Sequence, residues 1–290
     1  MPWTEITRAQ YRRDGLRYAS DTTEAEWAVI APLMPPARRL GRPRQTALRA
    51  VVDAIFYILT SGCQWRLLPK DFPPRSTVQG YFYAWRDDVT WHAIAVELTR
   101  QARHALGRND TPSAGIIDTP SAGIIDTPSA GIIDSQSAAT TESGGPRGLD
   151  AAKRVKGRKR HIVTDTEGFL LAVLVHTANV QDCHGAVPLL RALRRRLPRL
   201  RHIFADRVYR GDQLLNALAD CGPWTIEIVQ RPEGVKGFQL LPRRWVVERT
   251  FAWLGRCRRL AKDFEATIAT ETAWLFLAHI RLLSRRLARP

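Results

Sequence analysis

The order of short apolar strands and amphipathic helices in the second half of the chain constrains the fold more than any other sequence feature. Residues 161–164 and 170–175 are expected to pair as a hairpin, because the residues between them, 165–168, have the composition of a turn. With a strand over 130–133, the expected order predicts a layered α/β sheet. The elements expected after the hairpin are a helix over 183–197, a strand over 202–206, a helix over 212–220, a strand over 225–229, and helices over about 242–260 and 270–288.

The first half of the chain is predicted to be helical. Residues 21–24 have the pattern of a helix cap, a helix over 46–60 is apolar over most of its circumference, and Ser76 is expected to cap a further helix. Short helices joined by proline-marked turns are typical of a helix-turn-helix unit. The expected division is a flexible basic arm over 1–20, a small helical domain over 21–106, a linker over 107–129, an α/β domain over 130–265 and a basic C-terminal helix over 266–290.

The charge of the chain points to a polyanionic partner. Lys and Arg number 44 against 28 Asp and Glu, which gives a net charge of +16. A membrane partner is disfavoured, because the longest apolar stretch, 50–59, contains Asp53 and is shorter than the ~20 residues of a spanning helix. The first residues lack the pattern of a signal peptide, so we expect a cytoplasmic protein. The four cysteines form no Cys-x-x-Cys pair and predict no zinc site.

Two aspartates follow short apolar runs. Asp134 comes after 130–133 and Asp206 comes after 203–205. Sites in layered α/β sheets lie at the carboxyl ends of strands, so both residues are candidates for a metal-binding site. The alternative is that each aspartate starts a turn. From 135 to 158 the chain is rich in Gly, Ser, Thr and basic residues, and we expect a loop there.

Glu248 is the third candidate. It lies on a predicted helix beside the core-facing stripe of Val247, Phe251 and Leu254, and Arg244 is one turn earlier on the same face. One interpretation is a surface ion pair that contributes ~0.3–0.5 kcal/mol. The other is a metal ligand next to a guanidinium that grips a DNA phosphate.

Long motifs in a fixed order give the chain a resemblance to a known family. From about Tyr18 to Glu265 it resembles the DDE transposases of bacterial insertion sequences, in the group named after insertion sequence five. The resemblance implies an RNase H-like α/β core, a mixed sheet flanked by helices, after a small all-α helix-turn-helix domain. The motifs are Cys63-Gln64-Trp65-Arg66-Leu67-Leu68-Pro69, Asp71-Phe72-Pro73-Pro74, Ile133-Asp134-Ser135-Gln136-Ser137, Lys156-Gly157-Arg158-Lys159-Arg160-His161, Asn179-Val180-Gln181-Asp182, Ala205-Asp206 and the stretch from Trp245 to Leu254.

The resemblance implies a function and a set of residues. Asp134, Asp206 and Glu248 would be catalytic and would bind two Mg²⁺ ions, which Mn²⁺ could replace. The enzyme would cut the terminal inverted repeats of an insertion sequence and join them to target DNA, acting on double-stranded DNA as a homodimer or larger assembly. The residues expected to contact DNA are Arg42, Arg44, Lys159, Arg160, Arg244, Arg256 and Arg259. For Arg42 and Arg44, solvated loop charge is the alternative.

Some positions depart from the family pattern. Related transposases often have a Tyr and a Lys where this chain has Leu241 and Gly255, and small residues where it has Arg207. Arg207 could crowd the metal ions or pair with Asp206. Two other functions therefore stay open: a catalytically inactive copy that only binds DNA, and an RNase H-fold nuclease.

A perfect repeat precedes the first aspartate. The octapeptide Thr-Pro-Ser-Ala-Gly-Ile-Ile-Asp fills 111–118, 119–126 and 127–134, which suggests local duplication. A slip by eight residues would keep every side chain on the same face of a strand, so Asp126 could replace Asp134. We expect Asp134 to be used, because only it precedes Ser135-Gln136-Ser137, and the two earlier copies to form an exposed loop.

Overall fold

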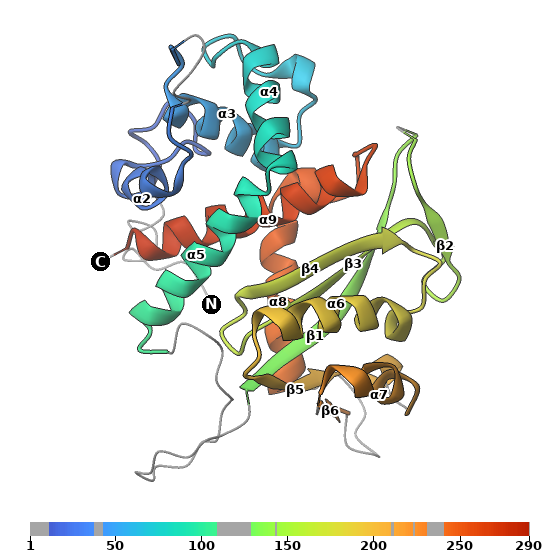
Figure 1. Ribbon diagram of the computed structural model, residues 1–290. Coiled ribbons are helices and arrows are strands. Elements are labelled where there is room, and N and C mark those ends of the chain that lie inside the picture. The colour runs from blue at the N-terminus through green and yellow to red at the C-terminus, as the bar shows by residue number, and fades with distance from the viewer. Residues whose placement is uncertain are drawn as a thin grey trace.

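The computed structural model describes residues 12–37, 43–108, 129–142, 144–209, 212–222, 224–230 and 241–289. A six-stranded sheet carries helices on both faces, and the N-terminal helices pack with the last helix of the chain (Figure 1). This arrangement confirms the predicted mixed α/β fold.

The sheet is mixed, with the order β2-β3-β1-β5-β6 and with β4 paired to β3. The pairs β1–β3, β2–β3 and β3–β4 are antiparallel, whereas β1–β5 and β5–β6 are parallel. The predicted hairpin is therefore confirmed as β3 and β4. The strands are β1 (Ser129–Ala139), β2 (Gly148–Asp150), β3 (Val155–Thr164), β4 (Leu170–Thr177), β5 (Leu200–Ala205) and β6 (Thr225–Ile228).

The prediction of a loop over 135–158 was wrong. Strand β1 continues to Ala139, β2 lies within the stretch, and β3 begins at Val155. The polar composition predicted a loop because the hydrogen-bond partners of these strand residues are side chains distant in the sequence. The hydroxyl of Ser135 donates to Asp182 at 2.7 Å, and that of Ser137 donates to Asp150 at 2.6 Å. A buried polar group with a partner is compatible with a central strand.

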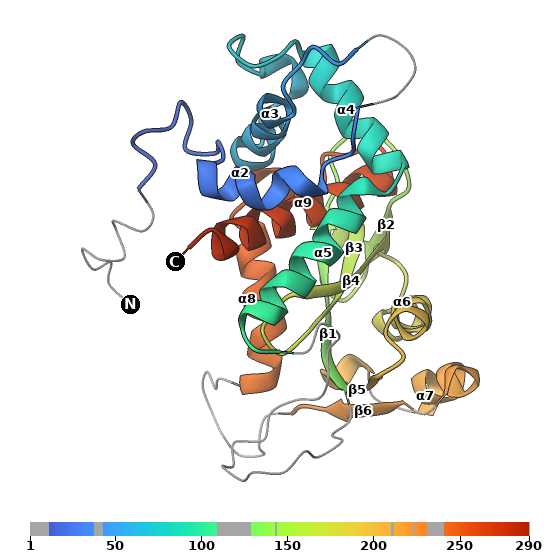
Figure 2. The ribbon, with the colours of Figure 1, turned by 60° about the vertical axis from the view of Figure 1, so that its left-hand side comes forward.

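Helices cover the two faces of the sheet (Figure 2). Helices α6 (Asp182–Arg196) and α7 (Asp212–Leu218) lie on one face, and α8 (Pro242–Gly255) lies on the other. Successive side chains of β1 point to opposite faces of the sheet and contribute to both cores. Ile133 belongs to the core under α6, and Ile132 belongs to the core under α8. The helix expected over 242–260 ends at Gly255 and is followed by the 3₁₀-helix η5 (Arg258–Leu260).

The N-terminal helices share a hydrophobic core with the C-terminal helix α9 (Ile268–Leu287). The ring centroids of Phe82 and Trp274 are 4.5 Å apart at this contact. The predicted cap within 21–24 is confirmed: Thr23 caps the first of these helices and forms a capping box with Glu26. Ser76 is not a cap, because its helix already begins at Arg75 after Pro74. These helices are α2 (Glu24–Ile30), α3 (Leu48–Ser61), α4 (Arg75–Asp87) and α5 (Thr90–Ala105).

Among the described residues, no helix is long and apolar enough to span a bilayer.

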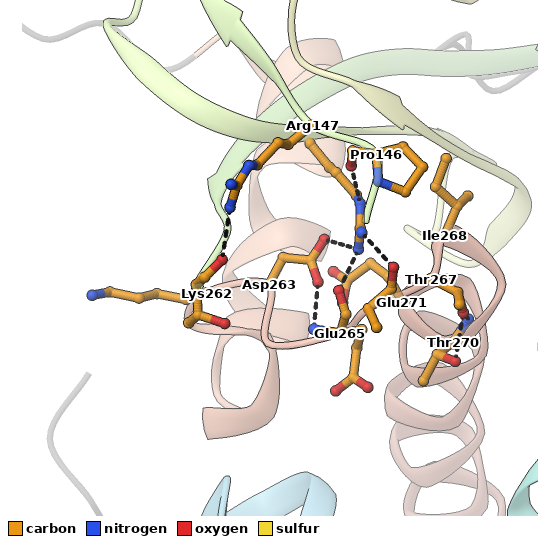
Figure 3. A network of polar contacts seen from close by, with 12 residues as sticks. Pro146, Arg147, Lys262, Asp263, Glu265, Thr267, Ile268, Thr270 and Glu271 are labelled. Atoms are coloured by element: carbon orange, nitrogen blue, oxygen red, sulfur yellow. Dashed lines mark hydrogen bonds and ion pairs between the residues drawn. The ribbon is translucent and has the colours of Figure 1, made fainter. Parts of the chain in front are cut away.

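Buried ion pairs fasten the segment before α9 to the sheet (Figure 3). Arg158 of β3 donates to Asp263 at 2.8 Å, and both side chains are fully buried. Arg160, two residues further along β3, pairs with Glu271 in the first turn of α9. Arg259 donates to Glu265 at 2.7 Å. We call Arg158, Arg160, Arg259, Asp263, Glu265 and Glu271 the buried ion-pair group.

Candidate active site

Asp134 lies near the middle of β1, not at the end of a strand as predicted from the sequence. The strand continues for five residues beyond it because Ser135 to Ala139 pair with β3. The carboxylate is half-buried and accepts a hydrogen bond from the backbone N–H of Ser135 at 2.7 Å. Pairing with β3 at Asp134 itself, and with β5 as far as Ile132, fixes the backbone that carries this carboxylate.

Asp206 directly follows β5, as the sequence predicted. Strand β5 is parallel to β1, and Ile132 of β1 pairs with Phe204 of β5. Asp134 and Asp206 each lie two residues beyond this pair. Their side chains therefore project from neighbouring strands at the same level and on the same face of the sheet. The backbone N–H of Val208 donates to Asp206 at 2.9 Å, which orients the second carboxylate.

Glu248 approaches from α8, which covers the same face of the sheet. Val247 and Phe251 are buried against the core, and the Glu248 side chain is 49% exposed. The Arg244 guanidinium lies 3.3 Å from the Glu248 carboxylate and 3.8 Å from the Asp206 carboxylate. Arg244 therefore links the helix glutamate to the strand aspartate, and Glu248 lies near the aspartates rather than on a remote surface.

The electrostatics of the site oppose ionisation of Asp134. Burial, together with the neighbouring Asp206 carboxylate, raises the pKa of Asp134 to about 6. The hydrogen bond from Ser135, the Arg244 guanidinium and the Lys153 ammonium act in the opposite direction. A cation placed near Asp134 and Asp206 would favour the ionised form of Asp134.

Comparison with known sequences decides the family. The sequence profile described as "Transposase DDE domain" matches residues 126–283, more than half of the chain. The chain belongs to the DDE transposase family. This confirms the resemblance recognised from the motifs and places the chain in a family of enzymes that cut and join DNA.

Two further comparisons of this DDE transposase agree with the family assignment. A profile described as "Putative transposase of IS4/5 family" matches residues 22–95. A Burkholderia cepacia protein named "Putative transposase for insertion sequence element IS402" is 40% identical over 140 residues, covering 46% of this chain and 64% of that protein. The match thus spans less than two thirds of this relative. No solved structure is significantly similar to the chain.

A polar network that the sequence did not reveal lies on the opposite face of β1. The carboxylate of Asp182, at the start of α6, accepts hydrogen bonds from Ser135 at 2.7 Å and lies 3.0 Å from the Lys159 ammonium. His161 is 3.5 Å from Asp182, and burial lowers the pKa of His161 to about 3, with a further contribution from His176. The sequence signals for this network were the motifs that contain Ser135, Lys159, His161 and Asp182, but nothing in the sequence showed that these residues meet.

The basic residues predicted to contact DNA occupy different environments. Arg244 lies at the site, and Arg256 is exposed at the end of α8. Arg44 donates to the carbonyl oxygens of Pro35 and Pro36 at 3.2 and 3.0 Å. Three others are buried and paired inside the protein, which leaves their charges no DNA-facing position: Lys159 with Asp182, Arg160 with Glu271, and Arg259 with Glu265.

Other predicted features lie beside the site or outside the described residues. Arg207 is exposed on the 3₁₀-helix η3 (Arg207–Tyr209), and the basic partner of Asp206 is Arg244. Arg42, Asp126 and the first two octapeptides lie outside the described residues.

The family implies use of a divalent metal ion. Within the described ranges, no three His, Cys, Asp or Glu side chains are grouped closely enough to hold one. The chemistry of the donor set nevertheless fits, because Asp134, Asp206 and Glu248 offer only carboxylate oxygens, the ligands that hard divalent cations prefer. Burial and the repulsion from Asp206 raise the pKa of Asp134, and such a cation would relieve that repulsion.

Proposed function

We propose that this protein cuts the ends of an insertion sequence and joins them to target DNA, with Asp134, Asp206 and Glu248 as its catalytic carboxylates. The observation that carries the proposal is the level placement of Asp134 and Asp206 on adjacent parallel strands, with Glu248 linked to Asp206 through Arg244. Both actions are phosphoryl-transfer reactions, which need negative charge neutralised and an oxygen nucleophile activated.

The three carboxylates would hold two Mg²⁺ ions, with Mn²⁺ as a substitute. The ions supply charge neutralisation at the phosphoryl oxygens and activation of the attacking oxygen. Arg244 supplies a planar guanidinium that can donate two parallel hydrogen bonds to a phosphate. Its contact with Glu248 holds that guanidinium at the site before DNA binds.

The proposed DNA-binding surface draws on exposed cations. Residues 21–106 would recognise the element ends and residues 130–265 would carry the chemistry, with 1–20 as an arm and 107–129 as a linker. Arg256 and the exposed arginines at the end of α6 and the start of β5 would contact phosphates without reading sequence, and a homodimer or larger assembly would hold two ends together. These arginines are Arg195, Arg199 and Arg201.

The decisive experiment removes one carboxylate. Asp206→Asn should reduce Mg²⁺-dependent cleavage of a duplex carrying the terminal sequences that bracket the gene by on the order of a thousandfold, several kcal/mol of lost transition-state stabilisation. Asp220→Asn is the matched control, because Asp220 is exposed and pairs with Arg191 away from the site. Equal cleavage by wild type and Asp206→Asn would overturn the proposal.

A second function is favoured by one observation. Arg244 contacts Asp206 and Glu248, where a cation would otherwise be needed, which suits an inactive copy that still binds DNA. Wild-type protein that binds the terminal duplex but never cuts it would support this function. Cleavage with no preference for the terminal sequences would instead indicate a general nuclease on the same fold.

A further inference from the structure

Lys153 lies in the turn between β2 and β3, close to the first carboxylate of the site. Its ammonium donates to the carbonyl oxygen of Ser135 at 3.4 Å. The same ammonium is close enough to Asp134 to lower the pKa of that carboxyl. Lys153 is an exposed residue, and the hydrogen bond of its ammonium to Ser135 is partly buried.

The turn between β2 and β3 is built to hold Lys153 in this place. The buried carboxylate of Asp150 accepts hydrogen bonds from the backbone N–H of Lys153 at 3.1 Å and from the Ser137 hydroxyl at 2.6 Å. The next residue, Arg154, has φ +52°, a left-handed conformation that is unfavourable for a residue with a side chain. Strained backbone of this kind persists only where the surrounding contacts determine it.

Two other cations in this part of the sheet already have carboxylate partners. Arg244 contacts Asp206 and Glu248, and Lys159 lies 3.0 Å from Asp182. Lys153, by contrast, forms no ion pair within the part of the chain that the structure describes. The ammonium of an exposed lysine that makes a single long hydrogen bond can turn to an incoming anion without breaking a salt bridge.

We propose that Lys153 binds a non-bridging oxygen of the DNA phosphate that lies over Asp134 and Asp206. The inference rests on the proposed function, since it assumes that DNA is the substrate of this site. Lys153 would approach the phosphate from the β2–β3 turn while Arg244 approaches from α8, so the two cations would hold it from different elements. Asp150 is then a positioning residue, because it acts only through the turn that carries Lys153.

The test identifies the DNA phosphate whose contribution to binding disappears when the Lys153 ammonium is removed. Terminal-sequence duplexes carry one neutral methylphosphonate at successive positions around the cleavage site, and binding is measured in Ca²⁺ to prevent cutting. Lys153→Ala should weaken binding to unmodified DNA by roughly ten- to a hundredfold, the scale of one charge-assisted hydrogen bond. It should also lower the salt slope of binding by about 1. At one methylphosphonate position the variant should show no further loss, because the same contact is already absent.

Two further variants keep the result interpretable. Lys156→Ala removes the same charge from an exposed position three residues away and should keep every methylphosphonate effect of the wild type. Lys153→Arg should retain the sensitive position and shows that the turn still folds. The inference is overturned if Lys153→Ala shows the wild-type methylphosphonate pattern, or if no phosphate near the cleavage site is sensitive in the wild type. Neither result depends on the cleavage comparison with Asp206→Asn, so the two proposals fail separately.

Discussion

Two groups of charged residues have members on the paired strands β1 and β3. They differ in exposure to solvent and in the balance of positive and negative charge. In the buried ion-pair group, each of three arginines has a carboxylate partner, and Arg158 and Asp263 are fully buried. In the group around Asp134 the carboxylates outnumber the cations that contact them, and Glu248 is half exposed. Paired charge shielded from water holds elements together, whereas accessible and unbalanced charge leaves room for ligands.

This difference limits what the net charge of +16 can mean for DNA binding. Arg160 and Arg259 lie in a sequence rich in basic residues, yet each is buried against its own carboxylate. Burial raises the pKa of Glu271 to about 8 in spite of the opposing effect of Arg160, which shows that burying this group is costly even with a partner. Only the exposed part of the positive charge is available to a polyanion.

The largest expected effect comes from breaking the buried group. Arg158→Ala leaves the Asp263 carboxylate buried without its partner, and the free energy of unfolding should fall by about 3–5 kcal/mol. Urea unfolding followed by circular dichroism measures this loss. Arg195→Ala, an exposed arginine on α6, is the control and should change stability by less than ~0.5 kcal/mol.

A double substitution sharpens the same prediction. Replacing both partners, as Arg158→Met with Asp263→Leu, should recover much of the lost stability, because no unpaired charge is then buried. If Arg158→Ala lowers stability no more than Arg195→Ala does, the pair does not fasten the segment before α9 to the sheet.

The next effect concerns Asp134, whose substitution should raise the free energy of unfolding instead of lowering it. Burial and Asp206 raise the pKa of Asp134 from 3.8 to about 6, so between these pH values the folded protein binds more protons than the unfolded chain. Stability from this group is present below pH 3.8 and is lost as the pH rises to about 6. After allowance for partial exposure, Asp134→Asn should be about 2 kcal/mol more stable than wild type at neutral pH without divalent ions.

Urea unfolding at a series of pH values, with and without Mg²⁺, tests this prediction. Wild type should gain stability from Mg²⁺ and the variant should gain less, because it has lost one ligand. An Asp134→Asn protein with the wild-type pH dependence and the wild-type response to Mg²⁺ would contradict the proposed role of this carboxylate.

The sequence predicted those features of the site that follow from local pattern. Apart from β2, the order of the sheet strands and the helices between them agrees with the structure, as do the position of Asp206 after β5 and the buried stripe through Val247, Phe251 and Leu254. Each depends on the alternation or helical spacing of apolar residues within a short window, which neighbouring residues alone determine.

What the sequence could not predict depends on partners far away in the chain. Asp134 was placed at a strand end because polar residues follow it, but Ser135 finds its partner Asp182 47 residues later. Arg160 was expected to face DNA, yet it is separated from Glu271 by 111 residues in the sequence. Polar composition identifies a loop or a binding surface only when no distant partner satisfies those groups.

The smallest expected effect on folding comes from Glu248. Glu248→Gln removes a half-exposed ion pair with Arg244 one turn away, so the free energy of unfolding should change by less than ~0.5 kcal/mol. Asp263→Asn makes the same carboxylate-to-amide change in the buried group and should cost far more, because the fully buried Arg158 loses its charged partner. Urea midpoints of the two variants compare the two groups directly. If Glu248→Gln also abolishes cleavage, the carboxylate that contributes least to folding is one that the reaction needs, whereas a large loss of stability would make Glu248 part of the framework of α8.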